Sequence, residues 1–118
     1  MPTEIQFEKA VKQATPKQIK AWIKRPQKIT TDDSDQSRYN IKDLAGNVME
    51  WNYDWYDSKA HLNSKVFHSD PYSLIKKEKL IRGASYATHR IDRRISKRRH
   101  KNPEHYALDL GFRCVQNF

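Results

Sequence analysis

The sequence predicts a small α+β domain with one N-terminal helix, short strands and much irregular structure. Helix-start signals occur at the beginning of the chain, a turn flanked by acidic and aromatic residues lies within 39–56, and strand-like runs occur at 80–86 and 108–118. A chain of 118 residues has room for one domain at most, so we assign 1–118 to a single domain.

Residues 1–24 have a helical pattern that a proline interrupts. Pro2 precedes an acidic first turn, and Thr3 with Gln6 three residues later forms the capping-box pattern found at helix starts. Pro16 ends this helix, and a second short helical segment is expected at 17–24. The predicted apolar stripe of the first helix comprises Ile5, Phe7, Ala10, Val11 and Ala14.

The stretch 39–56 is expected to organise the domain. Its turn, Ala45-Gly46-Asn47, contains residues that tolerate positive φ, and Trp51 opens an aromatic run expected to nucleate the core. Asp43 and Glu50 flank the turn, and carboxylate and carbonyl oxygens are the ligands of a hard cation such as calcium. A turn with two solvated carboxylates is the alternative.

Beyond this stretch, 52–79 is predicted to be a long irregular connection. Leu80–Tyr86 is predicted to form a short strand in which Gly83-Ala84 permits a close backbone approach. Alternating apolar residues over Leu108–Phe118 predict a terminal strand.

The positive charge of the chain is concentrated in one segment. The formal net charge is +9, and the segment 90–101, RIDRRISKRRHK, is the densest basic run. If this segment were helical, Arg90, Arg94 and Arg98 would form one cationic ridge suited to the phosphates of a nucleic acid. The alternative is that these arginines pair with internal carboxylates or carbonyls, and no nucleic-acid-binding signature accompanies them.

Cysteine content and hydropathy exclude several classes of protein. One cysteine rules out an internal disulfide, a four-cysteine zinc site and a CxxC redox centre. No run approaches the ~18 apolar residues of a membrane span, and no signal peptide is present. The sequence therefore leaves two alternatives for the compartment: the protein is cytoplasmic, or it is exported and its leader is absent from this sequence.

Five blocks, in the same order, resemble the C-terminal part of the formylglycine-generating enzyme (sulfatase-modifying factor) family. That resemblance covers nearly all of the chain and implies a variant of the C-type-lectin fold. Because the match begins where the family's domain is already under way, it implies a partial domain over 1–118, completed by a longer protein or by another chain. The blocks are MPTEIQFEKAV (1–11), YNIKDLAGNVMEWNYDWY (39–56), LIRGASY (80–86), RISKR (94–98) and LGFRCV (110–115).

The resemblance also implies roles for individual residues. It places a structural calcium ion at the central turn, held by the side chains of Asp43 and Glu50 and the backbone carbonyls of Gly46 and Val48. Residues expected to be structural, with the cysteine as a buried thiol, are Trp51, Arg94, Arg98, Arg113 and Cys114.

The residues needed for the family's oxidase chemistry are missing. In the family, two cysteines after the 80–86 strand hold copper, whereas 87–93 contains no cysteine and no other residue there replaces a soft thiolate. We therefore expect no copper, no catalytic residues and no formation of formylglycine. The histidines show no metal-binding spacing and are expected to be lone surface residues.

Three functions follow from these observations. The first is a non-catalytic module that binds a protein or peptide through Thr88, His89, Arg90 and Arg93. The second is a degenerate or split metal-dependent oxidase. The third is polyanion binding through the basic segment 90–101.

Overall fold

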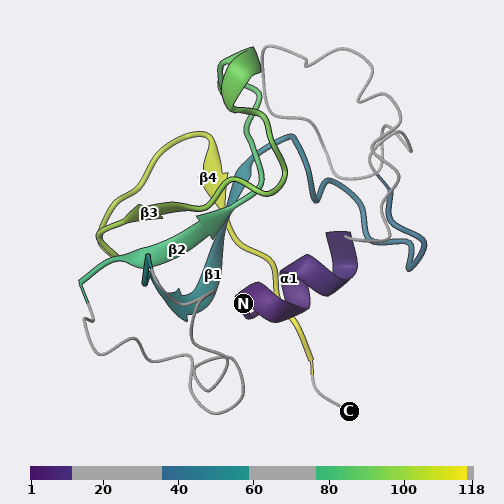
Figure 1. The fold of residues 1–118 in the computed structure, drawn as a ribbon, viewed down its shortest axis with the longest axis horizontal. Coiled ribbons are helices and arrows are strands. Elements are labelled where there is room, and N and C mark those ends of the chain that lie inside the picture. Colours follow the sequence, from purple (N-terminus) through teal and green to yellow (C-terminus); the bar gives the residue numbers. More distant parts are fainter. Residues whose placement is uncertain (12–35, 59–76, 117–118) are drawn as a thin grey trace.

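A computed structural model describes residues 1–11, 36–58 and 77–116, which form one helix packed beside a curled sheet (Figure 1). The α+β class predicted from the sequence is therefore confirmed, whereas the helical segment expected at 17–24 lies outside the described residues. No described helix is long and apolar enough to cross a membrane. The elements are α1 (Glu4–Val11), β1 (Met49–Trp55), β2 (Lys79–Arg82), the 3-10 helix η3 (Arg90–Asp92), β3 (Arg99–Lys101) and β4 (Leu110–Gly111).

The four-stranded sheet has the order β3-β2-β1-β4. β2 is antiparallel to both β1 and β3, and β4 pairs in parallel with β1. Trp51 lies opposite Ile81, and the register shifts between Trp51 and Trp55. β3 and β4 therefore occupy opposite edges of the sheet, although they are consecutive along the chain.

The start of α1 follows the predicted capping box. The backbone N–H of Thr3 donates to Gln6 Oε1 at 2.9 Å, and the N–H of Gln6 donates to Thr3 Oγ1 at 3.3 Å. Phe7 and Val11 are buried, but Ile5 is 43% exposed. Including Ile5 in the apolar stripe was wrong, because two residues along a helix correspond to a rotation of about 200° away from Phe7.

The core lies between α1 and the central turn. Phe7, Val11 and Leu44 form a buried cluster there, and Leu80 and Ile81 of β2 are also buried. The expectation that the first tryptophan of the aromatic run nucleates the core was wrong. Neighbouring strand residues point to opposite faces, and β1 buries Glu50 and Asn52 while Trp51 is only half-buried on the other face.

Ion pairs connect α1 to the sheet through the core. Arg82 is fully buried and its Nη1 lies 2.8 Å from Glu4 Oε1, while Nη2 bonds to Glu8. Arg98 reaches the same carboxylate, with Nε 2.7 Å from Glu4 Oε1. The Phe7 ring lies 5.0 Å from the Arg82 guanidinium. The first turn of the helix is thus held to the sheet by charge-assisted hydrogen bonds as well as by apolar contact.

Three predicted boundaries differ from the structure. Residues 52–55 belong to β1 rather than to an irregular connection, and β4 comprises only Leu110–Gly111 of the predicted terminal strand. β2 ends at Arg82 because Gly83 has φ of +78°, outside the strand region. The predicted close approach at Gly83 is confirmed, since a Cβ there would lie 3.1 Å from the Leu44 carbonyl oxygen.

Candidate functional site

The segment after β2 is anchored by its own hydrogen bonds. Ser85 is buried, and its Oγ donates to Asp109 Oδ2 at 2.6 Å. The N–H of Ser85 donates to Thr88 Oγ1 at 2.8 Å, and the N–H of Tyr86 donates to the Asn47 carbonyl at 2.9 Å. These bonds attach the segment to the central turn and to the residues before β4, so its backbone has a defined position on the sheet.

The four residues expected to contact a partner fall into two pairs. The Thr88 hydroxyl bonds to Ser85, and Arg93 Nε donates to the Thr88 carbonyl at 2.7 Å, so Thr88 and Arg93 hold the loop itself. His89 and Arg90 are exposed at the start of η3. The next residue, Ile91, is 75% exposed. The predicted partner-binding residues did not include it, although its position as an apolar residue within a basic run could have indicated a contact residue.

η3 is tied to β3 by backbone and charged contacts. Arg99 donates through Nη1 to the Gly83 carbonyl at 2.7 Å and through Nη2 to the Asp92 carbonyl at 2.5 Å. Burial lowers the pKa of the Arg99 guanidinium. A hydrogen bond from Lys97 holds the pKa of Asp92 below its usual range. The turn after η3 is therefore fixed at both ends.

The cationic ridge expected along 90–101 does not form. Only Arg90–Asp92 is helical, and the chain then turns and enters β3 at Arg99. Arg98 points to the buried Glu4, which supports its structural role and the alternative of internal pairing. Arg94 is exposed, with no side-chain hydrogen bond or ion pair among the described residues, so its structural role stays a prediction. The helical ridge of arginines on which the polyanion hypothesis was based is therefore not present.

A cavity of about 510 Å³ lies beside the central turn and brings together three of the four predicted calcium ligands, Asp43, Val48 and Glu50. The predicted positive φ is found at Asn47, with a φ of 66°. Gly46 is buried and does not line this cavity.

The donor set fits a calcium ion only in part. Its oxygens are the ligands that calcium prefers, but the guanidinium of Arg113 already binds Glu50, with Nε 2.6 Å from Oε2 and Nη2 bonded to Oε1. Arg113 Nη2 also donates to the carbonyls of Lys42 and Asp43 at 3.1 and 3.2 Å. A calcium ion would have to share Glu50 with this guanidinium. Within 1–11, 36–58 and 77–116, no group of three or more His, Cys, Asp or Glu side chains is placed to hold a metal.

The cysteine of the last block is not buried. Cys114 is exposed, so the expectation of a buried structural thiol was wrong. β4 ends at Gly111, so Cys114 lies outside the strand. Arg113, in contrast, joins the last block to the central turn, which supports the structural role predicted for it.

The sequence blocks and this fold can be compared with known proteins. A family model described as "Sulfatase-modifying factor enzyme 1-like domain" (FGE-sulfatase) matches residues 1–118. The chain belongs to the FGE-sulfatase family. The resemblance inferred from the five blocks is therefore confirmed over the whole chain.

Relatives of this FGE-sulfatase member have names that refer to different activities. A Chlamydia pneumoniae protein named serine/threonine-protein kinase pkn1 is 31% identical over 80 residues, which are 67% of this chain and 13% of that protein. The formylglycine-generating enzyme of Mus musculus is 30% identical over 80 residues, which are 65% of this chain and 21% of the mouse enzyme. The matched region is thus a small part of each relative.

Proposed function

We propose that this FGE-sulfatase member is a non-catalytic module, with a C-type-lectin-like variant fold, that binds a protein or peptide partner. The observation that carries the proposal is the loop 85–93. Internal hydrogen bonds hold its backbone, while His89, Arg90 and Ile91 are exposed at its tip. A loop already held in one conformation loses less entropy on binding than a mobile one, which favours recognition.

The absence of catalysis is proposed from the chemistry of the chain. A two-thiolate copper site needs two cysteines, and the sequence has only Cys114, which lies outside the loop. A relative named as a serine/threonine-protein kinase also supports a module that is not tied to the oxidase reaction. Metal analysis tests this point: copper or iron retained at about one per chain after chelation would favour the oxidase alternative.

The exposed side chains define the chemistry of the partner. Ile91 offers an apolar contact, and Arg90 beside it has no hydrogen bond or ion pair through its side chain among the described residues. Apolar anchors combined with arginine are typical of the centre of binding interfaces. We therefore propose an acidic peptide segment containing an apolar residue as the ligand of this loop.

A peptide-display selection on the immobilised full chain tests the proposal. The affinity of the selected peptides is then measured for wild type, Arg90→Glu and Lys9→Glu. Lys9 is exposed on α1, so its replacement makes the same change in charge away from the loop. Arg90→Glu should weaken binding by more than about tenfold, which corresponds to about 1.4 kcal/mol, and Lys9→Glu by less than about twofold. Equal affinities for all three proteins would refute the proposal.

The same test distinguishes binding at the loop from binding of a partner at the edge of the sheet. β4 is an edge strand, so another chain that completes the domain could add to the sheet there. Binding at that edge would survive Arg90→Glu. Loss of binding only in Arg90→Glu would assign the interaction to the loop.

We also propose a structural calcium ion at the central turn, bound by the carboxylates of Asp43 and Glu50 with the carbonyls of Gly46 and Val48. Support comes from the cavity that Asp43, Val48 and Glu50 line together. At free calcium about 100-fold above Kd, binding would stabilise the fold by about 2.7 kcal/mol. Calcium, compared with magnesium, should raise the melting temperature of wild type but not of Asp43→Asn. An unchanged wild-type melting temperature would refute the calcium site.

A further inference from the structure

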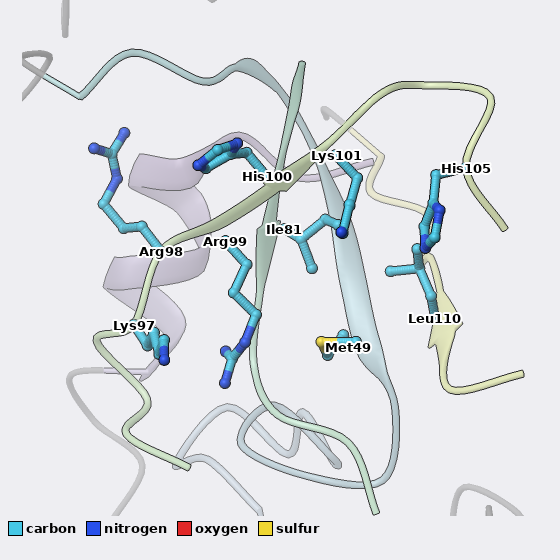
Figure 2. Close-up of a pocket in the computed structure, with 9 residues that line it drawn as sticks. All are labelled: Met49, Ile81, Lys97, Arg98, Arg99, His100, Lys101, His105 and Leu110. Atoms are coloured by element: carbon cyan, nitrogen blue, oxygen red, sulfur yellow. The ribbon is translucent and has the colours of Figure 1, made fainter. Parts of the chain in front are cut away.

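The connection between β3 and β4 creates a second cavity. These strands are the two edges of the sheet, so the chain between them, 102–109, has to cross from one edge to the other. A cavity of about 370 Å³ lies between this connection and the sheet, with an apolar floor formed by Met49, Ile81 and Leu110 (Figure 2). The volume lies within the range of small-molecule sites, roughly 300–1,000 Å³.

Alternation along β3 decides which basic side chains face this cavity. The side chains of Arg98 and His100, which also line the cavity, extend to one side of β3 (Figure 2), and they pair with Glu4 and Glu78. Lys101 points to the opposite side of β3, toward the hollow bounded by the apolar floor, and His105 faces it from the crossing connection. The cavity therefore has an apolar floor and a cationic side.

Of the basic side chains that line the cavity, Lys97 is paired with Asp92, whereas Lys101 and His105 lack an acidic partner among the described residues. The side chains of Lys101 and His105 have no hydrogen-bond or ion-pair partner among residues 1–11, 36–58 and 77–116. Lys79, directly opposite Lys101 in the β2–β3 register, bonds to the Tyr53 carbonyl and lies over the Trp55 ring, so it supplies no negative charge to Lys101. Arg99, on the same face, bonds through its terminal nitrogens to two backbone carbonyls rather than to a carboxylate. A bound anion would offset this excess positive charge.

We propose that this cavity binds a small organic anion with an apolar body, such as an aryl phosphate or an aryl carboxylate. The anionic group would lie between Lys101 and His105, where an ammonium and an imidazole supply donors. The apolar body would cover Met49, Ile81 and Leu110 and remove their side chains from water. This site is separate from the loop 85–93 and does not depend on the function proposed for it.

Isothermal titration of the full chain with phenyl phosphate, benzoate and inorganic phosphate tests the site. Saturable binding of at least one aromatic anion is expected, and the stronger of the two identifies the headgroup. Lys101→Gln should weaken that binding by about tenfold or more, because a hydrogen bond to a charged group is lost. Lys9→Gln, which removes the same charge on α1, should leave the affinity within about twofold.

Three outcomes would overturn the proposal. The first is no saturable binding of either aromatic anion by wild type. The second is equal weakening by Lys101→Gln and Lys9→Gln, which would indicate diffuse attraction to the net charge. The third is inorganic phosphate binding as tightly as phenyl phosphate, which would remove the role of the apolar floor. Peptide binding by Lys101→Gln, measured in parallel, should equal that of wild type, so the two proposals can fail separately.

Discussion

The buried carboxylate of Glu4 joins two guanidinium groups, and its neutralisation should cost much of the stability of the fold. The Arg82 side chain is 0% exposed and that of Glu4 is 11% exposed, so neither charge is well solvated. Glu4→Gln keeps the size of the side chain but leaves Arg82 with Glu8 as its remaining carboxylate partner. Removing one partner of a buried pair costs about 3–5 kcal/mol, and we expect about 3 kcal/mol because Glu8 remains.

Urea unfolding followed by tryptophan fluorescence measures this loss. With a denaturant slope of about 1.5 kcal/mol/M, the midpoint should fall by roughly 2 M. Asp92→Asn is the control, because it breaks the more exposed pair with Lys97 and should leave the midpoint almost unchanged. If Glu4→Gln shifted the midpoint no further than Asp92→Asn, the buried network would not be what holds α1 to the sheet.

Three further predictions concern single positions. Gly83→Ala should lower the free energy of unfolding by about 1–2 kcal/mol, because an alanine there would need φ of +78°. Gly111→Ala, with its new Cβ 3.5 Å from Val48 Cγ2, should be nearly neutral. Equal urea midpoints for the two variants would contradict this prediction. Burial raises the pKa of Asp54 from 3.8, so the stability that its protonated form contributes is present below about pH 3.8 and is lost as pH rises through the folded-state pKa. Asp54→Asn should therefore gain stability relative to wild type between about pH 4 and pH 7, and a difference independent of pH would argue against it. Exposed Cys114 should react with a thiol reagent at one site per native chain, and labelling that requires denaturant would show it to be buried.

Local chemistry explains which sequence predictions were confirmed. The capping box of Thr3 and Gln6 involves groups three residues apart, so the sequence alone contains both partners. The close approach at Gly83 also follows from one residue type, because only glycine combines a small volume with easy access to positive φ. The family blocks indicated the α+β class for the same reason: each block is a short run whose identity does not depend on distant contacts.

Predictions that depended on side-chain orientation and on contacts between distant residues were less accurate. The basic run at 90–101 has helical spacing, yet a three-residue 3-10 helix and a strand form there, because Arg99 finds carbonyl partners across the turn. The spacing of residues along the sequence contains no information about such tertiary contacts. Of the four residues predicted to contact a partner, His89 and Arg90 are exposed, whereas the polar groups of Thr88 and Arg93 bond within the loop, and their role in partner binding stays a prediction.

The sequence by itself determined the family, the helix start, the turn at Asn47 and the lack of a two-cysteine metal site. Tertiary structure alone decided which charges are used internally. Arg98 and Arg113 bond to the buried carboxylates Glu4 and Glu50, 94 and 63 positions away, while Lys101 is left facing a cavity. The physical reason is that an ion pair depends on distance and burial, and both are set by how the strands and the helix pack rather than by separation along the chain.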